Sequence, residues 1–298
     1  MSRETEKILK ELYKAIEGKE YESDEAAQAE IDAIVEKYNN GLKSNVTPMK
    51  KSADDYLDMA YDADTEEKAI EYAEKALKLD PHLIDARLLL LRYEDEAEYV
   101  KKQLEDVIKG ETKRLEKESY FEADAVGRFW GMLETRPYMR ARAAYVELLI
   151  EMGKIKKAAS ECEDILRLCE SDNMGMRYKL MTLYAYLEDA DSARDLSNKY
   201  KENSFSMLFP MAILYYKLDD LVKAEKILKK ILKSNEDYKA FLAGELELDE
   251  DKIEKVLSEG MYRPGTIEEV LSAIEEDSIL SVAIAYFNEW ACDVVLKN

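Results

Sequence analysis

The feature that most constrains the fold is the stretch from Lys68 to Pro81, which reads KAIEYAEKALKLDP. Ala69 and Ala76 are seven residues apart, so in a helix they share one face, and their small side chains let a neighbouring helix approach closely. Pro81 cannot continue a helix, because its ring clashes with the preceding turn and it lacks a backbone N–H. The stretch is therefore predicted to be the second helix of a helix-turn-helix unit.

The same arrangement recurs along the chain at intervals that suit a repeat of helix pairs, for which periods of about 34 residues are typical. Apolar residues follow the start of each second helix at +4 and +7 in every unit but one, where Ser197 and Tyr200 take those places. The widest interval contains residues 108–121, and it predicts a lengthened helix followed by a loop. Counting from Ala69, the small residue recurs after 31, 58, 35 and 31 residues, at Val100, Ala158, Ala193 and Ala224.

Three regions are predicted from these patterns. Residues 1–50 form a pair of helices, at 2–17 and 23–39, and a linker over 42–50, where helical periodicity is lost. Residues 51–245 hold four to five repeats. Residues 246–298 form a C-terminal helical cap, with helices near 250–258, 265–276 and 279–296, in which Phe287 and Trp290 cover the last repeat. The expected architecture is all-α, a right-handed solenoid of stacked antiparallel helix pairs.

The chain resembles a known superfamily over residues 52–245. The period and the placement of small residues resemble the tetratricopeptide-repeat (TPR) superfamily, and the Lys68–Pro81 stretch is the tightest match. Two further segments, GRFWGMLETRPYMRAR at 127–142 and DNMGMRY at 172–178, look like motifs of an uncharacterised bacterial group of such proteins. That group is similar to the human suppressor of tumorigenicity seven. The resemblance implies a superhelical TPR-like fold and an interaction scaffold.

The charge of the chain limits its partners. It carries 65 Asp and Glu against 44 Lys and Arg, a formal net charge of -21. Such a surface repels nucleic acid and anionic lipid, because phosphate binding draws on Lys and Arg. Hydrophobic residues make up 47% of the chain, which is enough for a packed core, and only 10 Gly and 5 Pro occur, which favours helices with short connections.

The sequence also predicts a cellular location. The N-terminus is polar and has no apolar segment of the signal-peptide kind. The longest apolar run, 279–287, is shorter than the ~20 residues that a membrane helix needs. Three cysteines leave an odd thiol in any disulfide scheme. We therefore expect a cytoplasmic protein with no membrane partner.

A local reversal of charge gives the main candidate binding site. Four arginines and a single acid, Glu134, lie between residues 125 and 144. Arginine suits bidentate recognition of carboxylate or phosphate, so an acidic peptide or chain terminus is the expected ligand. Pro137 fits the first turn of a helix on which Arg140 faces the inner groove, with Tyr178 and Thr182 lining that groove in the next unit. The candidate ligand-binding residues are Arg128, Trp130, Arg136, Arg140, Glu147, Tyr178 and Thr182.

The same arginines have a structural alternative. They can bind acids of adjacent helices and fix the angle between repeats. Arg140 and Arg142 are two residues apart, which is ~200° of rotation in a helix, so only one of them can face a given groove. Arg142 is expected to pack toward the neighbouring repeat. Both roles stay open for this arginine-rich segment.

No catalytic or metal site is predicted. The single histidine, His82, follows Pro81 in a turn, where a solvent-facing role is expected, and no nucleophile is placed beside it. Cys162 and Cys169 lie two helical turns apart without a zinc-ligand spacing, and Cys162 falls at a packing position. Glycine-rich phosphate loops are absent from the sequence. We expect no enzyme activity, no cofactor and no metal.

These observations favour a protein-protein interaction scaffold that binds a peptide or a partner helix in a concave groove. Two alternatives stay open. The first is a homo-oligomeric structural protein that self-associates through the Trp290 end or through the N-terminal helices. The second is a nucleic-acid-associated regulator acting through the basic segment 128–142, against which the overall charge argues.

Overall fold

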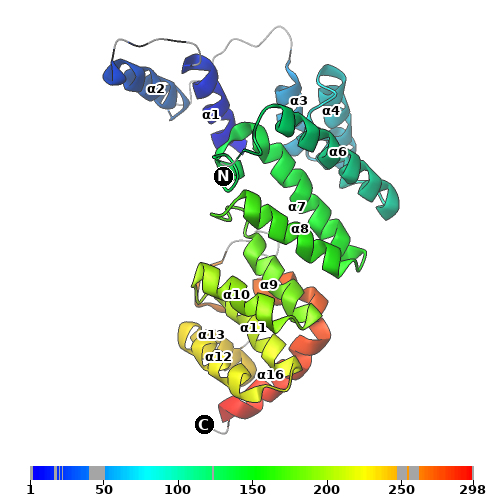
Figure 1. The fold of residues 1–298 in the computed structure, drawn as a ribbon, viewed down its shortest axis with the longest axis vertical. Helices are drawn as coiled ribbons and strands as arrows, with labels where there is room; N and C mark the ends of the chain where they lie inside the picture. The colour runs from blue at the N-terminus through cyan, green and yellow to red at the C-terminus, as the bar shows by residue number, and fades with distance from the viewer. Residues whose placement is uncertain are drawn as a thin grey trace.

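The computed structural model describes residues 3–16, 19, 21, 23–39, 51–122, 124–246, 254 and 262–296. These residues fold into helices, with isolated bridges near Gly127 and Cys169 in place of any strand. Most successive helices pack on their neighbours in the chain, and the molecule grows along one axis (Figure 1). The expectation of an all-α protein is confirmed.

Ten of the helices follow one another in five consecutive pairs, and in all but the second pair the two partners pack closely against each other. The paired helices are α3 (Ala53–Tyr61) and α4 (Glu66–Leu79), α5 (Ile84–Leu91) and α6 (Ala97–Lys117), α7 (Arg136–Glu151) and α8 (Ile155–Leu168), α9 (Met176–Leu187) and α10 (Ala190–Tyr200), and α11 (Phe205–Lys217) and α12 (Leu221–Ser234). The flanking elements are α1 (Arg3–Ile16), α2 (Asp24–Asn39), α13 (Glu236–Leu242), α15 (Ile267–Glu276) and α16 (Ser281–Leu296), with short 3-10 turns η1 (Phe129–Gly131), η2 (Leu133–Thr135) and η3 (Ser278–Leu280).

The residues used to align the repeats all lie in the second helix of a pair and all are buried. The relative exposures are 3% for Ala69, 8% for Val100 and 0% for Ala158, Ala193 and Ala224. The apolar residues at +4 and +7 are also buried in the four strong units, whereas Ser197 and Tyr200 of α10 are only partly buried. The small residues therefore do mark where neighbouring helices come together.

Local signals explain where several helices begin and end. Thr65 caps α4, since its hydroxyl accepts a hydrogen bond from the Lys68 N–H at 3.4 Å, and the helix stops before Pro81. α6 is the predicted lengthened helix at 21 residues, and a loop follows it. α7 starts after Thr135 with Pro137 in its first turn, as expected.

The helical core is not continuous from end to end. One large apolar cluster runs from α5 to α16, while two small, alanine-rich clusters lie between α3, α4 and α5. Helices α15 and α16, coloured orange to red in Figure 1, run alongside α11, and η3 contacts α9. Phe287 is fully buried and Trp290 packs against the same cluster.

Two predicted segments, the linker at 42–50 and nearly all of the helix near 250–258, lie outside the described residues. The apolar stretch at the C-terminus is longer than the 279–287 run seen in the sequence. Ser278–Leu296 is long and apolar enough to cross a membrane, at 19 residues with a mean hydropathy of 1.5, and 22% of it is buried. Its residues Ile284, Phe287 and Ala291 pack in the core.

Candidate functional site

Arg140 sits between two carboxylates from distant parts of the chain. Its Nε and Nη2 donate to Asp85 of α5 at 2.7 and 2.6 Å, and its Nη1 and Nη2 donate to Glu6 of α1 at 3.0 and 3.4 Å. Asp85 is 7% exposed and Glu6 is 8% exposed. We call these three residues the Arg140 site. Its guanidinium holds two carboxylates in bidentate pairs, which are the strong form of charge-assisted hydrogen bond.

Arg142 faces another helix. It is 5% exposed, and its Nε and Nη2 donate to Glu161 of α8 at 2.9 and 2.5 Å. Nη2 also lies 3.2 Å from an Asp164 carboxylate oxygen, and the guanidinium lies 5.7 Å from the centre of the Tyr138 ring. Arg142 thus joins α7 to α8 within one repeat pair, so the expectation that it packs toward the neighbouring repeat is wrong: its acidic partners lie on the other helix of its own pair.

The turns before α7 hold the other aromatic and basic candidates. Arg136 is 3% exposed, and its Nε donates to the Trp130 carbonyl at 2.8 Å while its guanidinium lies 5.6 Å from the Trp130 ring centre. Thr135 donates through its hydroxyl to the Phe129 carbonyl. Arg128 is exposed. Of the four arginines, Arg128 therefore presents its side chain most openly to solvent.

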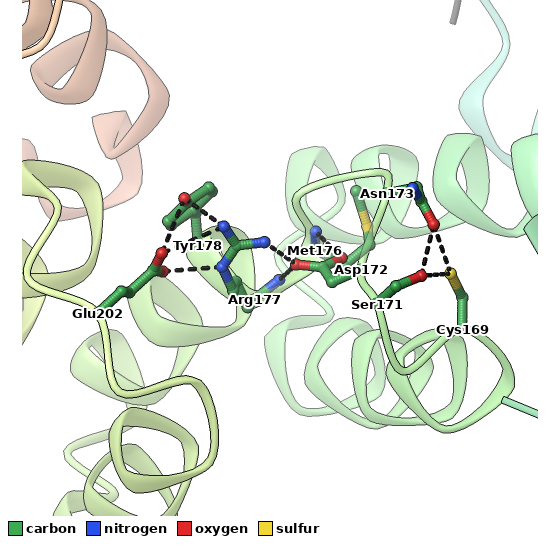
Figure 2. A network of polar contacts seen from close by, with 8 residues as sticks. All are labelled: Cys169, Ser171, Asp172, Asn173, Met176, Arg177, Tyr178 and Glu202. Atoms are coloured by element: carbon green, nitrogen blue, oxygen red, sulfur yellow. Dashed lines mark hydrogen bonds and ion pairs between the residues drawn. The ribbon is translucent and has the colours of Figure 1, made fainter. Parts of the chain in front are cut away.

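The second motif forms a buried polar network at the start of α9 (Figure 2). Asp172 accepts hydrogen bonds from the backbone N–H groups of Met176 and Arg177 at 2.8 and 3.0 Å, and from Arg177 Nη1 at 2.8 Å. The carboxylate therefore satisfies free N–H groups of the first helical turn and neutralises the arginine beside it. Gly175, which precedes the helix, has a φ of 71°.

Arg177 links this network to the turn after α10. Its Nε and Nη2 donate to Glu202 at 2.8 and 3.2 Å, and Nη2 lies 2.5 Å from the Tyr178 hydroxyl (Figure 2). The guanidinium also lies 4.1 Å from the ring centre of Tyr178 and 5.4 Å from that of Tyr200. Tyr178 is thus held in an intramolecular network of charges and rings.

The structure places the start of the first motif beside the loop that leads into the second. The Gly127 N–H donates to the Leu168 carbonyl at 3.1 Å, and the Glu170 N–H donates to the Gly127 carbonyl at 3.0 Å. Gly127 has a φ of 96°, and a Cβ there would lie 3.3 Å from the Glu170 side chain. A glycine is therefore required where the loop before α7 crosses the loop after α8.

Glu147 and Thr182 face different elements. Glu147 is exposed and forms an ion pair with Lys179 of α9 at 2.8 Å. Thr182 is 4% exposed, and its hydroxyl donates to Asp277 in the turn between α15 and η3. The predicted groove residues are therefore not brought into one open groove: Arg140 meets α1 and α5, and Thr182 is covered by the C-terminal helices.

Sequence reasoning missed the acids that complete these sites. Asp85 carries a detectable signal, because it is the lone acid in the otherwise apolar stretch IDARLLLL of α5, beside a single arginine. Asp172 and Arg177 lie within the second motif but were not singled out. Glu6 has no sequence signal as a partner of Arg140, since 134 residues separate them.

Groups suited to metal, histidine or thiol chemistry are sparse in the described ranges. No group of three His, Cys, Asp or Glu side chains there could hold a metal ion. His82 is exposed in its turn, as expected. Burial raises the pKa of the Cys162 thiol to about 12, which suits the packing position predicted for it. An open groove of about 600 Å³ lies between α8 and the α9–α10 turn, lined by Lys156, Glu163, Tyr184 and Glu188 among others.

The arrangement as a whole is a helical array in which Arg140, Arg142 and Arg177 form ion pairs with acids of the same chain. It offers oriented guanidinium and carboxylate groups for binding. Comparison of the chain with protein-family models, with curated proteins and with solved structures finds no match.

Proposed function

We propose that this chain is a non-enzymatic, cytoplasmic protein-interaction scaffold whose Arg140 site binds an acid-bearing helix. The observation that carries the proposal is that a helix of the chain itself, α1, binds at that site. Helix α1 places the Glu6 carboxylate on Arg140, although α1 and α7 are far apart in sequence. An amphipathic helix laid against other helices is a common mode of peptide recognition.

The Arg140 site is preorganised for such a ligand. Asp85 already fixes the guanidinium through Nε and Nη2, so Nη1 is aimed at the position that the Glu6 carboxylate takes. A rigid, oriented donor costs little ordering when a ligand binds. A partner helix with a carboxylate in the place of Glu6 would make the same contact.

The finer fold description belongs to this proposal. We infer a TPR-like, right-handed superhelix, on the support of four closely packed helix pairs and of buried small residues at the repeat anchors. A solenoid of this kind presents long surfaces to partner chains. The likeness to the bacterial group is part of the same proposal and is carried by the two motifs at 127–142 and 172–178.

The proposal is tested with α1 itself as the probe. A fluorescent peptide of residues 3–16, RETEKILKELYKAI, is titrated into the wild-type chain and into a Glu6→Arg variant. In the wild type the tethered α1 competes at an effective concentration in the mM range. In the variant, like charges at Arg140 weaken the docking of α1. We expect the peptide to bind the variant at least about tenfold more tightly.

Two matched controls accompany this titration. A peptide with Glu6→Gln should lose most of its affinity, and an added Arg128→Glu change in the protein should leave the affinity unchanged, because Arg128 lies outside the Arg140 site. Equal binding to both proteins, or no binding to either, would contradict the proposal.

Self-association is a second candidate with its own observation. α16 exposes apolar side chains at one end of the array, with Val282 73%, Tyr286 61% and Leu296 70% exposed. A mass that rises with concentration in sedimentation, and falls back in a Tyr286→Glu variant, would support a homo-oligomer. A nucleic-acid role is not proposed, because Arg136, Arg140 and Arg142 bond within the chain.

A further inference from the structure

The C-terminal unit, defined as α15, η3 and α16, meets the body of the array through polar contacts with α13 and with α9. The first polar point joins α13 to the start of α15. Asn235, 1% exposed, donates through Nδ2 to Glu269 and to the Thr266 carbonyl, both at 3.0 Å. Glu269 also accepts from the Gly265 N–H at 2.8 Å. The buried polar atoms named here have partners, so this point is well satisfied.

The second point joins α9 to the turn between α15 and η3, and it is incompletely satisfied. Asp277 is 5% exposed, and its Oδ1 accepts from the Thr182 hydroxyl. Its other oxygen, Oδ2, is buried and has no hydrogen-bond partner in the described part of the chain. A buried carboxylate with one unpaired oxygen is costly when ionised and much less so when protonated.

The surroundings of Asp277 add to this effect. Burial raises the pKa of the Asp277 carboxyl to about 7, the Thr182 hydrogen bond lowers it, the charge of Glu276 raises it and the charge of Lys179 lowers it. Lys179 belongs to α9 and Glu276 to α15, so one charged group comes from the body of the array and the other from the C-terminal unit.

We propose that Asp277 and Thr182 form a pH-sensitive latch that holds the C-terminal unit against α9 and loosens when the carboxyl ionises. The geometry favours this over a purely structural contact, because the first polar point, at Asn235 and Glu269, is fully paired while the Asp277 carboxylate is left half-paired. Loosening uncovers the inner face of α9 at Thr182, a residue predicted from the sequence to line a groove. The latch operates whether or not a helix binds at Arg140.

The direction of the pH effect follows from linkage. When the unit opens, Asp277 meets water and regains its ordinary pKa of 3.8, whereas in the closed state the pKa is about 7. Closure is therefore strongest below pH 3.8, and it weakens as the pH rises toward 7 because the open state loses its proton first. Between pH 5 and 7 the opening constant should rise up to about 100-fold, and it should level off above pH 7.

Hydrogen exchange of the peptide 278–296 measures this opening. Rates of the wild type are divided by rates of an Asp277→Asn variant at each pH from 5 to 8, so that intrinsic exchange and all other titrating groups cancel. We expect this ratio to climb up to about 100-fold between pH 5 and 7 and then to level off. A flat ratio would overturn the proposal.

Two more variants separate a latch from a simple packing contact. Thr182→Val removes the donor that favours the ionised carboxyl, so the climb should continue to higher pH. A merely structural role of Thr182 would raise exchange equally at every pH, and that result would also overturn the proposal. Glu289→Gln, which changes an exposed acid on α16, should show the same pH dependence as the wild type.

Discussion

Two guanidinium groups on α7, those of Arg140 and Arg142, form ion pairs with different elements although only one residue separates them. Arg140 is bound by Asp85 and Glu6, and Arg142 by Glu161 and Asp164. The helical rotation between them is a local property, so the sequence indicates correctly that they face different ways. The acids that receive them are long-range partners, and helical periodicity in one segment carries no information about those.

A substitution at Arg140 should reveal how much this pairing contributes. Arg140→Met leaves Asp85, 7% exposed, as a buried carboxylate without its cation. We expect the free energy of unfolding to fall by about 3–5 kcal/mol, as found when one partner of a buried ion pair is removed. Urea denaturation measures the change.

The exposed Arg128 provides the control, since Arg128→Ala should change stability by no more than about 0.5 kcal/mol. The double variant Arg140→Met with Asp85→Asn should recover part of the loss, because the unpaired charge is then gone. Equal effects of the Arg140 and Arg128 variants would contradict the importance of this ion pair.

The helices were largely predictable where residues at their own ends determine where they begin and stop. The expected 23–39 helix is α2, Asp24–Asn39, and the expected 279–296 helix is α16, Ser281–Leu296. Caps and prolines act on neighbouring backbone groups, so they are readable from one segment. Five helices are instead followed, within two residues, by a residue with positive φ, after which the next backbone N–H donates to the carbonyl five residues earlier. These residues are Ser119, Gly153, Glu188, Asp219 and Gly244, and three of them are not glycine.

The end of α11 offers a test of this element-scale feature. Asp219 has a φ of 57°, and the next N–H, that of Asp220, donates to the Tyr215 carbonyl at 2.9 Å. Glycine is the preferred residue at such a C-terminal position, because a Cβ there is strained. Asp219→Gly should raise the free energy of unfolding by about 0.5–1 kcal/mol.

The matched change at the end of α7 should have the opposite sign. Gly153 has a φ of 69° in the same setting, so Gly153→Asp should lower stability by about 1 kcal/mol. Thermal unfolding of both variants checks the pair. Loss of stability in Asp219→Gly would show that its carboxylate, and not its backbone conformation, matters at this turn.

The whole molecule is an array in which both ends fold onto the inner residues. The repeats themselves followed from small residues at regular spacing, since close helix packing demands them. The placement of α1 on Arg140 and of Asp277 on Thr182 could not be predicted from the sequence, because segments more than ninety residues apart meet there. The candidate groove was therefore predicted as an open surface, and these contacts place other parts of the chain over it.

Overall dimensions test the elongated arrangement. A compact globule of 298 residues would have a radius of gyration of about 19 Å. Stacking of helix pairs along one axis places mass farther from the centre, so small-angle X-ray scattering should give a larger value and an asymmetric distance distribution. A radius near 19 Å with a symmetric distribution would contradict the arrangement in Figure 1.

The alanine-rich contacts of α3 and α4 have a consequence for how the array comes apart. Ala60, Ala69 and Ala73 form a cluster separate from the large one that begins at α5. Little apolar area holds this first pair in place, and neighbouring repeats contribute most of the cooperativity in stacked folds. Heat or a protease should therefore unfold or cleave the chain from its amino-terminal side first.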